Sequence, residues 1–482
     1  MRRLTNESVC ALSRMLIARE ISSEELVRAF LERIAQKNGE IGAFITVCEQ
    51  SAIKRAVEID AMRARGEELG ALAGIPFAVK DNICTRGVAT TCGSRMLENF
   101  VPPYSATVIE KLESEGCILL GKLNMDEFAM GSATDTSIFG VCRNPLDTSR
   151  TAGGSSGGAA AAVAAGIVPF ALGSDTGGSV RQPAAFCGVV GAKPTYGAVS
   201  RYGLVAFASS LDQIGPITAD VRSNALVLDA IVGADKRDAT SKERAYSLLD
   251  NVSTDICGLR IGFPRSELDG VSADVARAML AAVDSLRTLG AQIVDITLPD
   301  TDALLAAYYI ISSAEASSNL ARFDGVRYGH RSERADTIDG LITKSRSEGF
   351  GDEVKRRIML GTYALSRDAR DTYYKRALLH RENLVLELEK TFAYCDAILM
   401  PTAPTVAHRL DRRAKAPLDI YIEDKLCVIA NMAGVPAISL PYGKGEGDMP
   451  VGVQLMCGAF GEPMLYRIAA ALEDSRGGEQ DE

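Results

Sequence analysis

The chain has 482 residues, 47% of them hydrophobic and 24% charged, and its 53 Lys and Arg against 62 Asp and Glu give a net charge of −9. This composition is typical of a globular protein with a large core, and the acidic balance argues against a nucleic-acid-binding chain. The eleven cysteines form no C-x-x-C pair, so neither a structural zinc site nor a disulfide-built domain is expected.

Residues 1–70 are predicted to form an N-terminal helical region. The start of the chain lacks the apolar stretch of a signal peptide, which favours a cytoplasmic protein. Ser22 and Glu25 form a capping-box pattern, and apolar residues then repeat every four positions on one helix face: Leu26, Phe30 and Ile34. A second, more polar helix is predicted over residues 51–68.

From residue 74 onward, short apolar runs alternate with helical patterns. Strands are predicted at residues 75–79, 117–120, 168–172, 259–263, 291–296, 397–400, 435–440 and 451–456. The intervening helices include residues 105–115, 273–289 and 374–392. This alternation predicts the α/β class, with a large mixed β-sheet core flanked by helices.

The uncharged stretch from Ser155 to Ser174 is as long as a membrane helix, which needs about 20 apolar residues. Pro169 interrupts it and Gly and Ala dominate it, so a buried helix followed by a buried strand is predicted. No linker rich in Pro, Gly or Ser divides the chain, and residues 1–482 are expected to form a single domain. Its polar region, about residues 235–390, predicts a largely helical excursion within that domain.

Three segments carry residue types suited to acyl transfer: GIPFAVKD with Lys80, GGSSGG at 153–158 and GSDTGGS at 173–179. Attack on an amide needs an activated nucleophile and preorganised N–H donors for the oxyanion. Each segment alone is weak evidence, because glycine turns are common and a lone lysine usually lies on the surface. GGSSGG is not followed by the lysine of a phosphate-binding loop, which argues against nucleotide binding there.

Lys80 is the candidate base, because the three histidines lie far from both serine motifs in the sequence. Distance along the chain does not exclude proximity in space. A lysine must be neutral to act as a base, and at its ordinary pKa of about 10.4 only about one in a thousand is neutral near pH 7. Burial in the apolar run before Lys80 would lower that pKa.

Together these segments resemble the amidase signature family, whose catalytic centre is a Ser-Ser-Lys triad. The resemblance implies that Ser179 is the acylated nucleophile, that Ser155 is a bridging serine with a cis peptide bond, and that Lys80 is the base. It also implies that Ser156 supports the loop, and that an oxyanion hole is formed by four backbone amides: Thr176, Gly177, Gly178 and Ser179.

A narrower resemblance is carried by the stretch GKLNMDEFAMGSATDTSIFG and by residues 315–329 and 353–366. These segments are similar to the A subunits of bacterial glutamyl-tRNA(Gln) amidotransferases. The resemblance implies that the chain releases ammonia from glutamine for a partner, the B subunit, which holds the mischarged tRNA and uses ATP. A small C subunit would brace the pair as a heterotrimer. It implies no metal or cofactor in this chain, with ATP and Mg in the partner.

The same resemblance implies glutamine-binding residues. Arg357 would bind the α-carboxylate and Asp424 the α-ammonium, although both lie in charged runs typical of solvated helix faces. Tyr309 would line the pocket, and Met130 would touch substrate through its backbone. Arg356 and Tyr308 are the neighbouring alternatives to two of these assignments.

Two positions depart from the family pattern: Val141 and Leu146 stand where Pro and Trp are expected. We expect both to be packing positions around the catalytic loop. Two other functions stay open from the sequence: a stand-alone amidase acting on small acyl or aryl amides, and a catalytically silent scaffold. The scaffold reading is disfavoured because Lys80, Ser155 and Ser179 are all present.

Overall fold

The computed structural model describes residues 4–244, 247–248, 253–411 and 422–476. Within them, one eleven-stranded sheet has the order β1-β3-β2-β6-β8-β7-β12-β13-β11-β9-β10, and β4 and β5 pair separately. The strands are β1 Phe44–Val47, β2 Pro76–Lys80, β3 Ile118–Leu123, β4 Arg143–Asn144, β5 Asp147–Thr151, β6 Phe170–Asp175, β7 Val190–Lys193, β8 Gln213–Thr218, β9 Arg260–Phe263, β10 Gln292–Asp295, β11 Ala397–Pro401, β12 Ala437–Lys444 and β13 Pro450–Met456.

The sheet is mixed, as the sequence predicted. Strand β2 is parallel to both of its neighbours, β3 and β6, whereas β6 is antiparallel to β8. Val79 of β2 stands opposite Leu172 of β6. Because parallel strands end at the same edge of a sheet, the residues that follow β2 and β6 emerge side by side.

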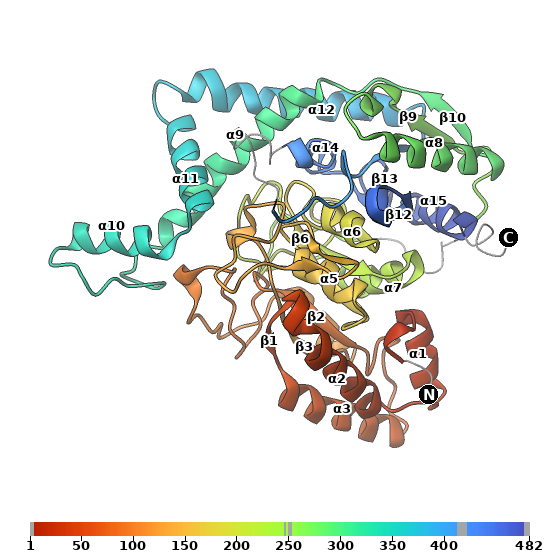
Figure 1. The fold of residues 1–482 in the computed structure, drawn as a ribbon, viewed down its shortest axis with the longest axis horizontal. Coiled ribbons are helices and arrows are strands. Elements are labelled where there is room, and N and C mark those ends of the chain that lie inside the picture. Colours follow the sequence, from red (N-terminus) through yellow and green to blue (C-terminus); the bar gives the residue numbers. More distant parts are fainter. Residues whose placement is uncertain (1–3, 245–246, 249–252, 412–421, 477–482) are drawn as a thin grey trace.

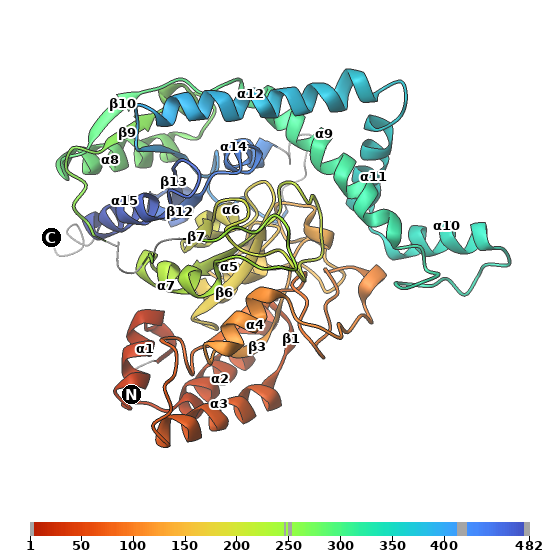
Figure 2. The same ribbon diagram turned by 180° about the vertical axis from the view of Figure 1, so that it is seen from behind.

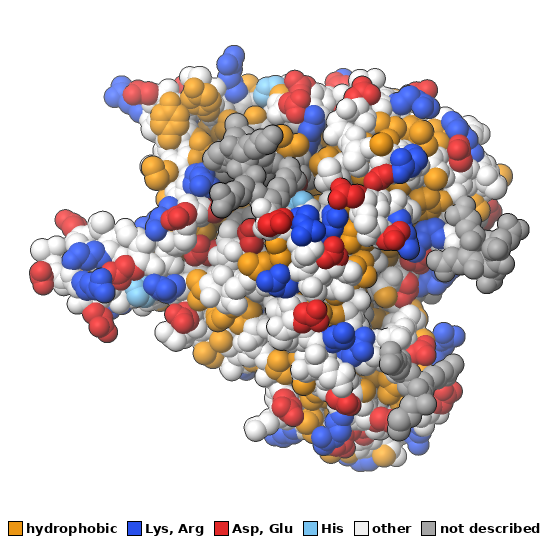
Figure 3. Space-filling model, in the orientation of Figure 1, with side chains coloured by type: hydrophobic (Ala, Val, Ile, Leu, Met, Phe, Trp, Pro, Cys, Tyr) orange, Lys and Arg blue, Asp and Glu red, His pale blue; other side chains and the backbone are white. Residues whose placement is uncertain are grey.

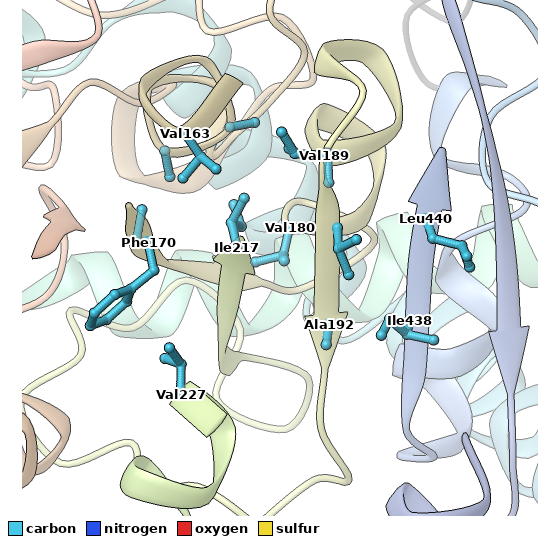
Figure 4. Packing of buried hydrophobic residues seen from close by; sticks show 14 of the residues in the cluster. Val163, Phe170, Val180, Val189, Ala192, Ile217, Val227, Ile438 and Leu440 are labelled. Carbon is cyan, nitrogen blue, oxygen red and sulfur yellow. The ribbon is translucent and has the colours of Figure 1, made fainter. Parts of the chain in front are cut away.

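Helices cover both faces of the sheet (Figure 1). The α-helices are α1 Val9–Ile17, α2 Ser23–Ile41, α3 Glu49–Ala64, α4 Thr107–Ser114, α5 Gly157–Ala164, α6 Arg181–Cys187, α7 Val221–Ile231, α8 Ala273–Thr288, α9 Thr301–Asn319, α10 Ile338–Gly349, α11 Asp352–Ala364, α12 Lys375–Phe392, α14 Val428–Ala433 and α15 Glu462–Ser475. Figure 4 shows Val163 of α5 and Val227 of α7 approaching the sheet from opposite sides.

The N-terminal helices form as the sequence predicted. The Ser22 hydroxyl caps α2 by accepting a hydrogen bond from Glu25 N at 3.0 Å. The apolar face of α2, with Leu26, Phe30 and Ile34, is buried in the main hydrophobic core. Helices α1 to α3 therefore cover the β1–β3 end of the sheet, at the bottom of Figure 1.

The predicted excursion at 235–390 has two different parts. Strands β9 and β10 lie within it and join the main sheet, and the described residues of 235–255 form turns rather than helix. The largest helical part is α9 to α12: α9 and α12 extend from the β9–β10 end of the sheet, and α10 projects from the body (Figures 1 and 2). Side chains of both charges crowd this projection (Figure 3). We call residues 301–392 the helical arm.

The uncharged stretch 155–174 forms α5 followed by β6, which confirms the predicted buried helix and strand. Throughout the described ranges, no helix combines the length and apolar character needed to cross a bilayer. The packing role expected for Val141 and Leu146 is wrong: their side chains are 38% and 56% exposed. Both lie in surface segments around β4, and their apolar side chains face solvent rather than the catalytic loop.

Candidate active site

Lys80 is the last residue of β2, and its side chain is completely buried. Its Nζ lies 2.8 Å from Ser155 Oγ, 2.9 Å from Ser156 Oγ and 3.3 Å from the Ser174 carbonyl oxygen. The strand ends at this point, so a lysine there reaches beyond the sheet edge toward the loop before α5. The structure thus brings Lys80 and Ser155 into direct contact.

Burial lowers the pKa of Lys80 to about 7, while the nearby carboxylates of Asp126, Asp175 and Asp212 act to raise it. The sequence argument anticipated this direction from the apolar character of β2. At neutral pH about half of such a lysine is uncharged, and only the uncharged amine can accept a proton.

The loop that carries Ser155 is tightly folded. The Gly154–Ser155 peptide bond is cis, as the resemblance implied, and Gly153 has a φ of +80°. A Cβ on Gly154 would lie 2.2 Å from Asp126 Oδ2 and 2.7 Å from Ala133 N. Only glycine fits at this position. The tight approach directs Ser155 and Ser156 together toward Lys80.

The turn that carries Ser179 connects β6 to α6. Ser179 lies just before α6, which begins at Arg181. Its carbonyl oxygen accepts a hydrogen bond from Ser156 N at 3.1 Å, which ties the two serine motifs together. In the described part of the chain, no protein atom hydrogen-bonds to the partly exposed Ser179 hydroxyl, so it is free to meet a substrate.

Asp175 organises this turn, and sequence reasoning did not single it out. Its carboxylate accepts hydrogen bonds from Gly178 N at 2.8 Å and from Val180 N at 3.2 Å. Because a backbone amide has one N–H, the Gly178 donor is engaged here. Of the four backbone amides expected to form the oxyanion hole, Gly178 N–H is thus already engaged, and we expect the donors to be Thr176, Gly177 and Ser179.

A buried ion pair with Arg181 holds the Asp175 carboxylate in place. Arg181 bonds to both carboxylate oxygens, at 3.1 and 3.0 Å, and Asn431 Nδ2 adds a contact of 2.9 Å. Burial alone would raise the pKa of Asp175, but the Arg181 guanidinium outweighs it and holds that pKa well below its usual range. The carboxylate therefore stays charged and keeps its bonds to the turn.

Asp212 and Tyr308 fix the other side of the same turn. Thr176 Oγ1 donates to Asp212 Oδ1 at 2.7 Å, and burial raises the pKa of Asp212 to about 6. The Tyr308 ring lies against Gly177, where a Cβ would come within 2.5 Å of its hydroxyl oxygen. Since Tyr308 belongs to α9, the helical arm reaches the nucleophile turn directly.

Three of the four residues expected to bind glutamine lie on the helical arm or at residues 422–424. The Arg357 guanidinium stacks over the Tyr309 ring at 4.5 Å, and Tyr309 Oη donates to Asp424 Oδ2 at 2.7 Å. Burial raises the pKa of Asp424 to about 7, against the lowering effects of Tyr309 and Arg357. Arg357 is 3% exposed and bonds to Glu353 at 2.7 Å.

The neighbouring alternatives differ in their surroundings. Arg356 faces outward and pairs only with Glu353 among the described residues, so the buried arginine is Arg357. Tyr309 contacts Asp424 and Arg357, whereas Tyr308 packs on Gly177. The Tyr308 and Tyr309 rings meet edge-to-face with centroids 5.0 Å apart, so the Arg357–Tyr309–Asp424 cluster adjoins the ring that packs on the nucleophile turn.

Met130 is buried in the same hydrophobic cluster as Tyr308 and Tyr309. Its backbone N–H donates to the Glu127 carbonyl oxygen at 3.0 Å, so its own carbonyl is the backbone group left for a substrate. His330 and His408 pair with Glu348 and Glu423 rather than with the serines. Across the described residues, no group of three or more His, Cys, Asp or Glu side chains is arranged to hold a metal ion.

Comparisons with known proteins match nearly the whole chain. The profile of the family described as Amidase covers residues 25–466. The A subunit of the glutamyl-tRNA(Gln) amidotransferase of Moorella thermoacetica is 53% identical over 96% of this chain and 95% of its own length. The second A subunit of this kind in Clostridium acetobutylicum is 50% identical over 96% of this chain and 98% of its own length.

A solved structure agrees with these relatives. The crystal structure of the glutamyl-tRNA(Gln) amidotransferase A subunit from Thermotoga maritima is 40% identical, with a TM-score of 0.81. The match covers 98% of this chain and 95% of that one.

Proposed function

The chain belongs to the amidase family, and from that premise we propose that it is the glutamine-hydrolysing member of a cytoplasmic tRNA-dependent amidotransferase. The ammonia it releases converts Glu-tRNA(Gln) to Gln-tRNA(Gln) on a partner. The observation that carries the proposal is the Arg357–Tyr309–Asp424 cluster, in which Arg357 and Tyr309 are buried and Asp424 is partly exposed. An amidase of simple amides has no use for an anion-binding and a cation-binding group at one end of its pocket.

In the proposed reaction, Ser179 Oγ attacks the side-chain carboxamide carbon of glutamine. Its proton passes through the Ser155 hydroxyl to neutral Lys80, 2.8 Å away. The free amides of Thr176, Gly177 and Ser179 stabilise the oxyanion. The proton held by Lys80 then goes to the leaving nitrogen, ammonia departs, and water hydrolyses the γ-glutamyl ester on Ser179 to glutamate.

Specificity follows from the two ends of glutamine. The planar Arg357 guanidinium matches the α-carboxylate, and Asp424 matches the α-ammonium. The carbonyl oxygen of Met130 offers a further acceptor. We propose that this chain carries no cofactor, that ATP and Mg act in the B subunit, and that the same partner holds the tRNA while the C subunit braces the heterotrimer.

The test is ammonia release from glutamine by the purified chain, alone and with candidate B and C subunits, with and without ATP and Glu-tRNA(Gln). Release that depends on the partners and rises with charged tRNA supports the proposal. Partner-free turnover of simple amides with glutamine ignored would identify a stand-alone amidase. Arg357 and Asp424 would then have another role.

A further inference from the structure

The loop after β3 and the start of α11 meet at one buried carboxylate, Glu127. The N–H of Gly351, the N-cap residue of α11, donates to Glu127 Oε1 at 3.1 Å and to Oε2 at 2.9 Å. The Ser94 hydroxyl also donates to Oε1, and it lies 3.2 Å from the Gly349 carbonyl oxygen. Glu127 is 3% exposed, so these are its main interactions.

The approach of Glu127 to α11 leaves no free space. A Cβ on Gly351 would lie 2.3 Å from Glu127 Oε2, so any larger residue at this helix cap would displace the carboxylate. The next residue, Phe128, packs edge-to-face on Phe350 with ring centroids 5.6 Å apart. A carboxylate at the N-terminus of a helix also interacts favourably with the helix dipole.

The backbone after Glu127 is strained. Phe128 and Ala129 have φ values of 49° and 62°, in the left-handed region that side chains with a Cβ rarely adopt. Such a conformation persists only where surrounding contacts fix it. The Glu127 bonds and the Phe128 packing supply those contacts, so the carboxylate has one defined position.

Arg357 follows Gly351 on the same helix, about 9 Å along its axis at a rise of 1.5 Å per residue. The position of this guanidinium therefore depends on where α11 begins. We propose that Glu127 is a positioning residue for glutamine specificity, which anchors the start of α11 and thereby holds Arg357 over the substrate carboxylate. This inference rests on the proposed function, because it assumes that Arg357 binds glutamine.

A double-mutant cycle tests it, with kcat/KM for ammonia release measured on the full chain assembled with its partner subunits. The variants are Glu127→Gln, Arg357→Ala and the double variant, with Glu98→Gln as an exposed control from the same region. The substrates are glutamine and 4-aminobutanamide, which lacks the α-carboxylate. Gly351→Ala is a second route to the same contact, since its Cβ would displace the carboxylate.

Glu127→Gln is expected to lower kcat/KM for glutamine about tenfold, mainly through KM, and to change that for 4-aminobutanamide by less than about twofold. In the Arg357→Ala background the same substitution should have almost no effect, because the group it positions is gone. Gly351→Ala should reproduce the loss.

Equal losses in both backgrounds, or on both substrates, would mean that Glu127 only supports the fold, and no loss on glutamine would refute the inference outright. If Arg357→Ala alone leaves glutamine kinetics unchanged, the glutamine-binding part of the proposed function fails instead. The two failures are therefore distinguishable.

Discussion

Replacing Lys80 by arginine, combined with a pH profile of the wild type, tests the proposed base. Arginine keeps the positive charge and similar length, but it does not deprotonate in proteins. We expect Lys80→Arg to lose ammonia release by about three orders of magnitude or more, since the triad acts as a unit. The wild type should instead gain activity as pH rises through the pKa of Lys80.

The size of that gain follows from burial. With a pKa of about 7, Lys80 is about 9% neutral at pH 6 and about 91% neutral at pH 8, so the rate should rise about tenfold. At the ordinary value of 10.5, about 0.03% would be neutral at pH 7. Burial therefore increases the amount of active base about 1,500-fold at that pH.

The assay must separate Lys80 from Asp424, whose pKa is also raised to about 7. Hydrolysis of glutamine requires both neutral Lys80 and ionised Asp424, because the α-ammonium of glutamine pairs with the Asp424 carboxylate. Glutaramate, which keeps the carboxylate and carboxamide but lacks the ammonium, needs Lys80 alone. Its kcat/KM between pH 6 and pH 8 thus reports on the base, and Asp424→Asn should leave that profile unchanged.

Two results would refute this reasoning. A flat profile over that range, or a rise only above pH 9, would mean that Lys80 is not a base with a lowered pKa. A Lys80→Arg variant with most of its activity retained would show that the proton is accepted elsewhere.

Three further outcomes are expected. Ser155→Ala should also lose several orders of magnitude of ammonia release, and adding Lys80→Arg should lower the rate little further, because the two pass the same proton. Asp175→Asn leaves Arg181 buried without its ion pair, so the free energy of unfolding measured in urea should fall by about 3–5 kcal/mol. A fall of less than about 1 kcal/mol would contradict the proposed role of Asp175 in supporting the turn. Gly177→Ala places a Cβ 2.5 Å from a tyrosine hydroxyl, and the shifted turn should lose about 100-fold in kcat/KM.

Apolar periodicity predicted most of the fold correctly, because strands such as β11 and β13 are buried on both faces and read as continuous apolar runs. Strand β8 escaped prediction. It contains Gly215 and Pro216, which normally argue against a central strand, yet a Cβ on Gly215 would lie 1.9 Å from the Ala192 carbonyl oxygen. The glycine is there because two backbones approach closely, and a single sequence does not reveal that contact.

At the candidate site, local sequence motifs predicted the reactive residues. The family resemblance supplied the glutamine-binding residues, which lie far from those motifs in the sequence. Lys80 and the two serine motifs are legible because glycine and burial leave clear local patterns. Asp175, Asp212 and Glu127 were missed, since a buried carboxylate and an exposed one look alike in sequence. Their roles depend on partners such as Gly351, which lies 224 positions from Glu127.

The separation between the sheet and the helical arm bears on how the substrate specificity of such a hydrolase can change. The residues proposed to break the amide bond lie at the end of β2, in the loop between β2 and β6, or just after β6. The proposed ligands of the zwitterion come instead from α9, α11 and residues 422–424. Substitutions in the arm away from Tyr308, which packs on Gly177, can alter which amide is admitted without disturbing the proton path. The architecture is in this sense modular. The reaction centre at the sheet stays the same, while the substrate-binding residues of the helical arm can vary.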